Sequence, residues 1–271
     1  MTDQADNLRR LLERVTPKLP HKARRIAFLS GKGGVGKTSL AVNTSLTLSR
    51  MGHKTILIDC DLGLANADFL LGIQTVSTLD SVIVSGQDVR KAVIVMPSGL
   101  WLVPGAGSII PRQAVLSGRL EHMLDRLDGD AEFIIMDAAA GIDEGVQYVA
   151  QLSDEIVVVA MAESAAAINA YRLIKIMHEH KPPPAIRLII NRSPSHTAAQ
   201  RTAAGIMKAS SDFLDMGIEY LGWVPNDPTV EQAARERRPL VEKYPASDSA
   251  RSIVAIASRL IQQPPKSPDA A

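Results

Sequence analysis

Apolar residues in this chain gather in short continuous runs separated by mixed polar stretches. Seven runs predict strands and cover residues 25–30, 54–61, 100–105, 132–139, 155–161, 185–192 and 219–225. Because most of them do not alternate with polar residues, they indicate strands buried on both faces, as in a parallel sheet covered by helices. Stretches with helical spacing, such as 36–52 and 169–180, lie between them. This order predicts an α/β fold with a doubly wound, mostly parallel sheet and ligand chemistry at the carboxyl ends of the strands.

The pattern divides the chain into three regions. Residues 1–25 are polar and basic, and their apolar stripe predicts a helix over 3–15, followed by a linker that two prolines begin. Residues 26–262 carry the alternating strand and helix patterns and form the predicted folded domain. Residues 263–271 are proline-rich and lack large apolar side chains, which predicts a disordered tail.

Composition narrows the classes of function. The 271 residues carry 30 Lys and Arg against 29 Asp and Glu, so the formal net charge of +1 gives the whole chain no strong field for nucleic acid. The single cysteine, Cys60, excludes an internal disulfide and a metal site built on several cysteines, and it favours a reducing cytosol. The beginning of the chain has no secretory pattern, and no run approaches the roughly 18 apolar residues of a membrane span.

The stretch SGKGGVGKTSL carries the strongest chemical signal. Residues 31–38 fit the phosphate-loop pattern G-x-x-x-x-G-K-[ST] between a predicted strand and a predicted helix, which is the context the motif requires. Backbone N–H groups of such a loop and the helix N-terminus favour phosphate oxygens. Lys37 is predicted to reach the β- and γ-phosphates, and Thr38 to ligate Mg²⁺. The predicted nucleotide contacts of this stretch are Gly31, Gly33, Gly34, Val35, Gly36, Lys37, Thr38 and Ser39.

Three aspartates end apolar runs. Asp59 and Asp61 end one run, with Cys60 between them, and Asp137 ends another. One such aspartate is more often a helix cap or turn, but three beside a phosphate loop predict a Mg²⁺ site and a position for the attacking water. The strand period of two places Asp59 and Asp61 on one face and Cys60 on the other. Cys60 is therefore interpreted as a core residue rather than a reactive thiol.

Five ordered motifs resemble the ParA/MinD family of ATPases, which carry a deviant Walker A loop. The motifs are GKGGVGKTS, DCDLGLANADFLLG, DAAAGI, AESAAAINAYRLIK, and INRS together with LGWVPNDPTVEQAARERRPL, and the similarity covers about residues 24–262. The resemblance implies ATP or ADP and Mg²⁺ as cofactors, and two subunits that close face to face over two ATP molecules. The early lysine of the loop, Lys32, then acts across the dimer on the partner's nucleotide. Without the resemblance, Lys32 is an ordinary exposed loop lysine.

The resemblance also assigns roles around the phosphates. Asp61 matches the residue that orients the attacking water. Thr38 matches the Mg²⁺ ligand, and Asp59 and Asp137 match its supporting shell. Glu163 matches an acid near the dimer face that contacts ribose or the partner.

At the other end of the nucleotide, the resemblance assigns contacts to adenine. Asn191 matches a side chain that contacts the base edge, and Pro225 to Asp227 match a loop that packs against the base. Hydrogen bonding to the base edge discriminates strongly between bases, so ATP is favoured over GTP.

The chain departs from the family pattern in three places. Ala138 replaces the Thr or Ser that usually follows the Walker B aspartate, which is Asp137 here. The loss of that hydroxyl affects switch II coupling or the positioning of the attacking water. Asn169 replaces an Asp, and a nearby proline is missing, which puts the contacts around Glu163 in doubt. The C-terminal amphipathic helix by which many relatives hold membranes is absent, and the apolar stripe over 250–263 is expected to pack in the core as the last helix of the fold. Membrane contact therefore has only weak support.

The beginning of the chain matches one branch of the family. Asp3, Gln4, Ala5, Leu8 and Arg9 carry a D-Q-A-x-x-L-R element found in many FlhG (FleN) proteins, which regulate flagellar number and placement. The resemblance implies a cytoplasmic homodimer that docks onto the signal-recognition-particle-type GTPase FlhF. It further implies recruitment to the cell pole or the inner membrane face and contact with a flagellar transcription regulator or a basal-body protein. A helix that packs on its own domain accounts for the same apolar stripe.

Other functions stay open. One is a MinD- or ParA-type regulator of division or partition, and the ParA type binds DNA through a basic face. The cluster RERR at 235–238 is the only tight basic run of the domain and is more typical of a solvated helix face, so nucleic acid is not an expected partner. Another is a nucleotide-switched interaction module with negligible turnover, which Ala138 favours. A nitrogenase-like iron protein needs two cysteines and a bacterial tyrosine kinase needs a C-terminal tyrosine cluster, and the chain has neither.

Overall fold

The computed structural model describes residues 23–61, 65–75, 77–105, 118–179 and 185–263. Its strands are β1 (Arg24–Ser30), β2 (Thr55–Cys60), β3 (Ile94–Val95), β4 (Trp101–Val103), β5 (Phe133–Ala140), β6 (Glu155–Met161), β7 (Ala185–Ser193) and β8 (Glu219–Pro225). Within these residues they form one eight-stranded sheet in the order β3-β4-β2-β5-β1-β6-β7-β8. Only β3 is antiparallel to its neighbour.

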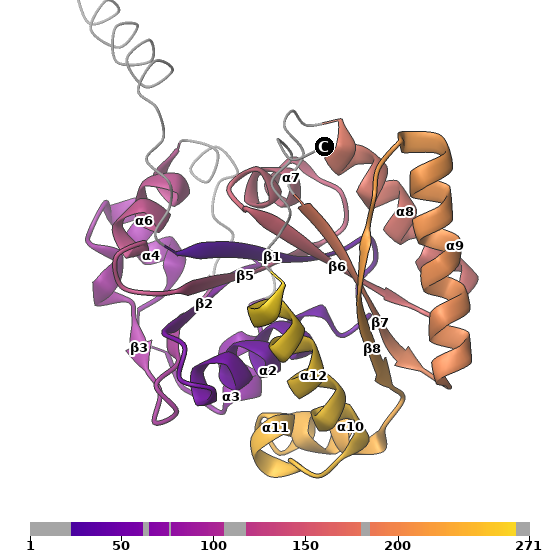
Figure 1. The fold of residues 1–271 in the computed structure, drawn as a ribbon. Coiled ribbons are helices and arrows are strands. Elements are labelled where there is room, and N and C mark those ends of the chain that lie inside the picture. The colour runs from indigo at the N-terminus through magenta and orange to yellow at the C-terminus, as the bar shows by residue number, and fades with distance from the viewer. Residues whose placement is uncertain (1–22, 62–64, 76, 106–117, 180–184, 264–271) are drawn as a thin grey trace, which may run out of the picture.

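Helices cover both faces of this sheet (Figure 1). They are α2 (Lys37–Arg50), α3 (Ala67–Leu71), α4 (Leu79–Ser85), the 3₁₀ turn η1 (Val89–Lys91), α6 (Arg119–Leu127), α7 (Glu144–Gln151), α8 (Ser164–His178), α9 (His196–Leu214), α10 (Pro228–Arg235), α11 (Leu240–Lys243) and α12 (Asp248–Gln262). The predicted α/β class with a doubly wound, mostly parallel sheet is confirmed. The N-terminal helix over 3–15 and the tail from 264 onward lie outside the described residues.

All seven predicted runs contain strands, and every strand end lies within two residues of the predicted end. The sheet begins at Arg24, two residues before the predicted boundary of the domain. β2 ends at Cys60, so the prediction that Asp61 shares a strand face with Asp59 was wrong. The two-residue strand β3 was not predicted, because it is too short to give an apolar run.

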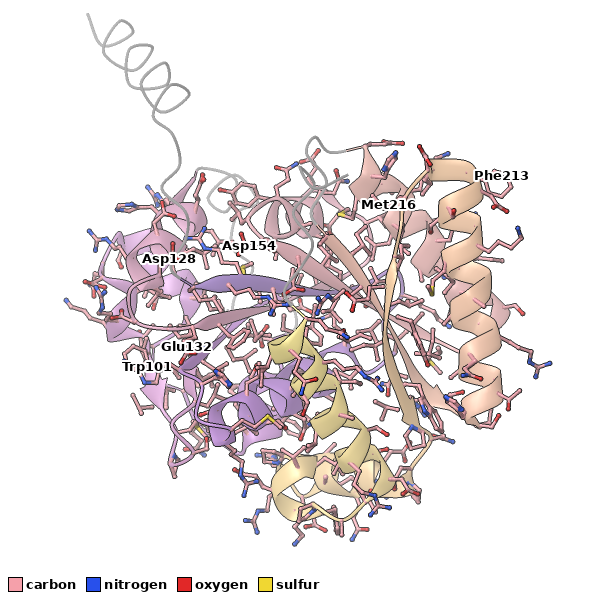
Figure 2. All side chains as sticks on the ribbon, in the orientation of Figure 1. Trp101, Asp128, Glu132, Asp154, Phe213 and Met216 are labelled. Carbon is pink, nitrogen blue, oxygen red and sulfur yellow. The ribbon has the colours of Figure 1, made fainter. Side chains whose placement is uncertain are left out.

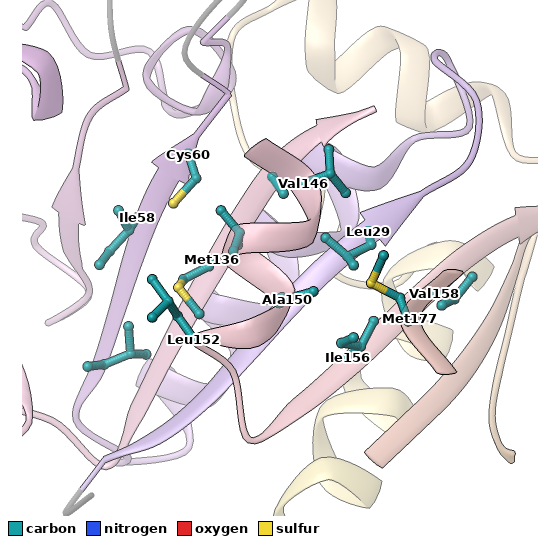
Figure 3. Close-up of a cluster of buried hydrophobic side chains, with 14 of the residues drawn as sticks. Leu29, Ile58, Cys60, Met136, Val146, Ala150, Leu152, Ile156, Val158 and Met177 are labelled. Atoms are coloured by element: carbon teal, nitrogen blue, oxygen red, sulfur yellow. The ribbon is translucent and has the colours of Figure 1, made fainter. Parts of the chain in front are cut away.

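The sheet separates two apolar cores. Along β2, Ile56 and Ile58 belong to one core and Leu57 to the other, which is the burial on both faces that the continuous runs predicted. The first core lies between the sheet and α4, α6, α7, α8 and α9, and Figure 3 shows the part of it around α7. The second core lies between the sheet and α2, α3, α10, α11 and α12. Cys60 is buried in the first core, as predicted.

The apolar stripe of the last helix packs in the second core. In α12, Ile253, Ile256 and Leu260 are buried, whereas Val254 on the same helix is 40% exposed. Helix α12 lies against β8 and α2. The interpretation of residues 250–263 as the last helix of the fold is therefore confirmed.

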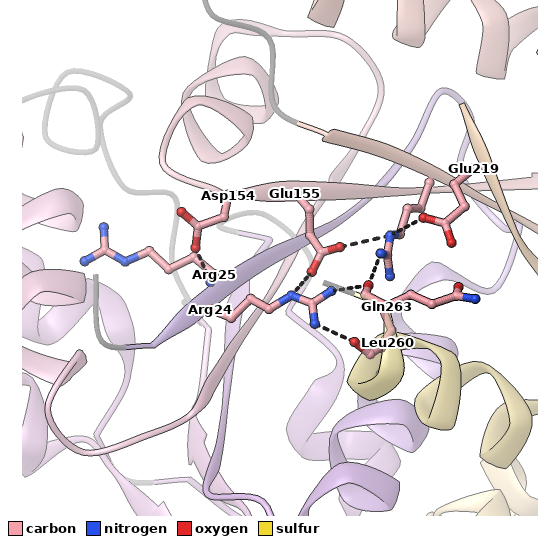
Figure 4. Close-up of polar contacts among 8 residues, drawn as sticks. Arg24, Arg25, Asp154, Glu155, Glu219, Leu260 and Gln263 are labelled. Atoms are coloured by element: carbon pink, nitrogen blue, oxygen red, sulfur yellow. Dashed lines mark hydrogen bonds and ion pairs between the residues drawn. The ribbon is translucent and has the colours of Figure 1, made fainter. Parts of the chain in front are cut away.

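A buried cluster of charged side chains lies at the amino ends of the central strands. Glu155 is fully buried and pairs with Arg24 and with Arg187, whose Nε lies 3.2 Å away (Figure 4). Burial raises the pKa of Glu155, and the two arginines oppose this shift. The same arginines donate to the carbonyl oxygens of Leu260 and Gln263, so the cluster ties the end of α12 to β1, β6 and β7.

Arg25, the next residue of β1, connects the beginning of this strand to Asp125, Asp128 and Asp154. Its guanidinium is buried and pairs with Asp125 at 2.8 Å and Asp128 at 2.9 Å, while its backbone N–H donates to Asp154 (Figures 2 and 4). Removing both aspartates would leave the buried guanidinium uncompensated, which is strongly destabilising. The cluster lies at the amino ends of the strands, and we assign it a structural role.

Candidate active site

The carboxyl ends of the parallel strands meet at one edge of the sheet, and residues 31–36 leave that edge between β1 and α2. Gly34 and Gly36 have φ angles of +79° and +86°, which favour glycine. A Cβ on Gly31 would lie 2.2 Å from the carbonyl oxygen of Asn169 in α8. The loop therefore needs glycine at 31 to pass α8, and the structure has the strand–loop–helix context that the motif requires.

Lys37 opens α2 and lies inside the site. Its side chain is 6% exposed and forms an ion pair with the fully buried Asp137 of β5. Its Nζ also lies 3.5 Å from the Thr38 hydroxyl. Burial raises the pKa of Asp137, and the neighbouring Lys37 opposes that shift. The structure thus brings together three of the predicted site residues.

Asp59 lies beside Asp137, because the two residues are paired in register between β2 and β5. Its carboxylate is buried and accepts backbone N–H groups from Asp61, Asn66 and Ala67, each at 3.0 Å. Burial and repulsion from Asp137 raise the pKa of Asp59 to about 7, against the opposing effect of these three hydrogen bonds. Asp59 therefore connects the metal side of the site to the beginning of α3.

The remaining phosphate-side residues lie nearer the surface. Lys32 is exposed, as are its neighbours Gly33 and Gly34. Asp61 is half-buried directly after β2, and Glu163 is exposed at the beginning of α8. The two lysines of the loop thus have opposite environments, since Lys37 is buried on a carboxylate and Lys32 faces solvent.

Asn191, the side chain predicted to contact the base edge, lies near the carboxyl end of β7. Its side chain is 6% exposed, and its amide nitrogen donates to the carbonyl oxygen of Val35 at 2.7 Å. A Cβ on Gly36 would lie 2.4 Å from that nitrogen. Asn191 therefore holds the phosphate loop, a contact that the sequence did not predict, and it lies between the loop and the predicted base end.

The loop predicted to pack against adenine is fixed to the last helix. Asp227 caps α10 by accepting from the Thr229 N–H at 2.9 Å, and it also accepts from the Ser249 N–H at 3.3 Å. The Ser249 hydroxyl donates to the carbonyl oxygen of Pro225 at 3.2 Å. These bonds give residues 225–227 a defined shape at the carboxyl end of β8.

The donor set fits Mg²⁺ better than a transition metal. Thr38, Asp59 and Asp137 offer hard oxygen donors, and Mg²⁺ in nucleotide sites takes few protein ligands beside phosphate and water. Within the described residues, Oδ2 of Asp137 is buried and has no hydrogen-bond partner. The same part of the chain holds no cluster of three or more His, Cys, Asp or Glu suited to a metal.

Sequence reasoning missed Gly105, which follows β4. A Cβ there would lie 2.6 Å from the Ala65 Cβ and 2.9 Å from the Asp59 carboxyl carbon. Glycine at this position lets the chain pass closely over Asp59. The apolar run at 100–105 ended at this glycine, but the pattern contains no sign of the approach.

Cys60 and the RERR cluster, both singled out in the sequence, make contacts that indicate a structural role. Burial raises the pKa of the Cys60 thiol, which argues against a reactive thiolate. In the RERR cluster, Arg237 lies over the Phe69 ring, and Glu236 pairs with Lys243 at 2.8 Å. Among the described residues, no helix is long and apolar enough to cross a membrane.

The parallel sheet, the glycine loop and the buried Lys–Asp pair define a P-loop nucleotide-binding protein. Residues 22–261 match the family model described as ParA, NUBPL iron-transfer P-loop NTPase. The chain is 31% identical to the antiactivator FleN of Pseudomonas aeruginosa over 247 residues, which cover 90% of this chain and 88% of that protein. It is 28% identical to the flagellum site-determining protein YlxH of Helicobacter pylori, over 97% of this chain and 92% of that one.

Solved structures show the same fold. The MinC:MinD complex of Aquifex aeolicus matches with a TM-score of 0.73 and 27% identity, over 90% of this chain and 98% of the other. MinD of Pyrococcus horikoshii with Mg-ADP matches with a TM-score of 0.72 and 25% identity, over 88% and 96%. The chain belongs to the ParA/MinD family of P-loop ATPases, and the resemblance inferred from its motifs is confirmed.

Proposed function

We propose that this ATPase is a dimerising switch that regulates flagellar number or placement. ATP and Mg²⁺ close two subunits face to face, partners recognise the closed form, and hydrolysis opens it. The observation that carries the proposal is the opposite placement of the two loop lysines. Lys37 is buried and pairs with Asp137 of its own subunit, whereas Lys32 is exposed to solvent.

The phosphate side of the site supplies the chemistry. Bound ATP with Mg²⁺ supplies the scissile phosphoryl group and the charge neutralisation that phosphoryl transfer needs. Lys37 would bind phosphate oxygens in place of Asp137, and Thr38, Asp59 and Asp137 would hold the metal. Asp61 orients the attacking water from its half-buried position. The phosphate-loop residues from Gly31 to Ser39 contribute backbone N–H groups.

The base end selects the nucleotide. The amide nitrogen of Asn191 donates to the phosphate loop, and its amide oxygen is proposed to contact the adenine edge. Pro225 and Asp227 form the wall against the base through the backbone that Ser249 fixes. Glu163 lies exposed at the beginning of α8, where it contacts ribose or the partner subunit.

Lys32 acts in trans on the partner's nucleotide. The test compares wild type, Lys32→Ala and Asp61→Ala by light scattering with ADP and with ATP. We expect wild type and Asp61→Ala to become dimers with ATP, and Lys32→Ala to bind ATP yet lose dimerisation or turnover. An ATP-bound wild type that stays monomeric at all protein concentrations contradicts the proposal.

The flagellar branch rests on the relatives. The similarity to FleN and to YlxH covers most of the chain. FleN is named an antiactivator, and YlxH is named a flagellum site-determining protein. The proposed partner is an SRP-type GTPase that docks on the N-terminal helix through Asp3, Gln4, Ala5, Leu8 and Arg9. A flagellar transcription regulator or basal-body protein is the proposed second partner.

Deletion of residues 1–15 tests this partner. The deletion is expected to leave ATP binding intact and to abolish stimulation of GTP hydrolysis by FlhF. Stimulation that persists after the deletion contradicts the assignment. The matched control is the full chain, which keeps residues 1–15.

A second candidate is a nucleotide-switched interaction module with negligible turnover. Ala138 favours it, because this buried position follows Asp137 and offers no hydroxyl to the site. Phosphate release with and without partner distinguishes the two functions. Turnover well below about one per hour under all conditions favours the module over typical enzymes.

A further inference from the structure

Helix α3 is fixed at its beginning by the active site. Backbone N–H groups of Asn66 and Ala67 donate to the Asp59 carboxylate, which also accepts from Asp61. One carboxylate therefore orients both the first turn of α3 and the residue proposed to orient water. A displacement of α3 breaks these bonds and changes the backbone at Asp61.

Helix α3 is fixed at its end by Arg237, which belongs to the RERR cluster. Gly72 ends α3 with φ +69°, and a Cβ there would lie 2.6 Å from the Arg237 carbonyl oxygen. The Arg237 guanidinium carbon lies 4.5 Å from the centroid of the Phe69 ring, within the range of a cation–π contact. Both contacts join the turn after α10 to the last turn of α3.

Arg237 is the left-handed residue that directly follows the C-cap of α10. Its φ is +52°, a region that non-glycine residues seldom adopt. A left-handed residue is common at this position, directly after the last turn of a helix. The N–H of Arg237 donates to the Ala234 carbonyl, which closes the end of α10.

The turn that carries Arg237 is itself fixed on the phosphate-loop helix. In α11, the Val241 N–H donates to the Asn43 side chain at 3.0 Å, and Arg50 donates to the Val241 carbonyl oxygen at 3.2 Å. Asn43 and Arg50 belong to α2, which begins with Lys37. The turn therefore gives α3 a support that is rigid relative to the phosphate loop.

We propose that Arg237 is a positioning residue that holds α3 in a fixed position relative to the phosphate loop. Through the hydrogen bonds of Asp59, it thereby also positions the backbone of Asp61. The inference rests on the proposed function of Asp61 in orienting water. Arg237 contacts α3, so its loss is expected to change the rate of hydrolysis while nucleotide affinity stays. Within the basic cluster, the contacts with α3 come from Arg237.

Amide hydrogen exchange measures the support directly. In the full chain, Arg237→Asn keeps a residue that tolerates positive φ but removes the guanidinium. We expect exchange of the Leu70, Gly72 and Ile73 amides to rise by about two- to fivefold, which corresponds to an exposed cation–π contact. Phe69→Leu gives the same rise, and the double variant adds little, because both changes remove one contact.

A matched pair of glycines tests the carbonyl contact. Gly72 and Gly86 both end short helices, with φ of +69° and +66°, but nothing lies within 4 Å of a Cβ on Gly86. Both Ala variants carry the same backbone penalty, and only Gly72→Ala meets Arg237. We expect Gly72→Ala to lower the kcat for ATP by tenfold or so, with KM unchanged within about twofold, while Gly86→Ala keeps both.

Arg237→Lys is the rescue variant, because it keeps a cation over the Phe69 ring. We expect its kcat to lie between those of Arg237→Asn and wild type. Unchanged exchange at the end of α3 in Arg237→Asn overturns the proposal, whatever the ATPase rate. Equal kcat in Gly72→Ala and Gly86→Ala also overturns it. If the wild type has no ATPase at all, the proposed function fails, and the exchange cycle still decides the contact between Arg237 and α3.

Discussion

The ion pair between Lys37 and Asp137 predicts a large and specific loss of stability when the carboxylate is removed. Asp137 is fully buried and the Lys37 side chain is 6% exposed. Asp137→Asn removes the charge that neutralises the buried ammonium, which keeps the Thr38 hydroxyl 3.5 Å away. An unpaired buried charge costs more than the pair itself contributes, so the variant loses more than a hydrogen bond.

The expected cost is about 3 kcal/mol, the lower end of the usual range for breaking a buried pair. The lower end applies because Asp137 also repels Asp59, and the substitution relieves that repulsion. For a domain of this size, the same loss corresponds to a melting temperature lower by about 6–12 °C. Lys37→Met costs less, because a buried carboxylate without a partner takes up a proton instead of staying charged.

Urea denaturation of the nucleotide-free chain, followed by far-UV circular dichroism, measures these values. The double variant Lys37→Met/Asp137→Asn is expected to be less destabilised than the sum of the single variants by about 2 kcal/mol, since no charge remains unpaired. Lys32→Ala in the same loop is the control, and its exposed side chain predicts a change of under about 0.5 kcal/mol. Additive single variants, with Asp137→Asn within about 0.5 kcal/mol of wild type, refute the reasoning.

Three further predictions test other parts of the account. Gly31→Ala, whose Cβ would lie 2.2 Å from a carbonyl of α8, lowers the midpoint of thermal unfolding far more than Gly33→Ala, where nothing lies within 4 Å; equal shifts contradict this. Because the folded-state pKa of Asp59 is about 7 against an ordinary 3.8, the folded chain binds a proton that the unfolded chain has lost. Stability therefore falls as pH rises from about 4 to 7, and Asp59→Asn flattens that decline in urea titrations; an unchanged slope is the contrary result. In α12, Ile256→Ala costs about 2–5 kcal/mol in urea while Val254→Ala, at 40% exposure, costs little, and a reversal of this order contradicts core packing.

The strand pattern predicted most of the fold because burial on both faces leaves a direct record in the sequence. The seven apolar runs gave the strands, and the phosphate-loop motif gave the edge of the sheet where the site lies. The order of the strands was not predictable from these runs, since pairing depends on which helices fill each face. The short strand β3 left no pattern because two residues, Ile94 and Val95, are fewer than the period needs.

The site was predictable where its residues follow a motif and not where they meet by packing. Lys37, Thr38 and Asp137 come together as their positions after β1 and in β5 required. The contact from Asn191 to the loop and the approach of Gly105 over Asp59 depend on three-dimensional packing between distant segments. No spacing in the sequence records such contacts.

The basic cluster shows the same limit. The run RERR was interpreted as a solvated helix face, because a run of like charges is usually exposed, and residues 235–238 are indeed exposed. In the fold, Arg237 adopts positive φ and lies over Phe69, which comes from a segment more than a hundred residues earlier. Only the packing of α3 against the turn after α10 gives this arginine a role.

The central claim is that Lys32 acts on the nucleotide of the other subunit. The most direct test mixes two inactive variants, Lys32→Ala and Asp61→Ala, and measures ATP hydrolysis of the mixture. In a mixed dimer, the Lys32→Ala subunit keeps its own Asp61 and receives Lys32 from the partner, so one of its two sites is complete.

If subunits exchange freely, half of the dimers are mixed, and the mixture is expected to recover about one quarter of the wild-type rate per subunit. Each variant alone, at the same total concentration, stays inactive. If Lys32 acts within its own subunit, no combination of these chains has a complete site. A mixture no more active than the separate variants, although mixed dimers form, contradicts the account.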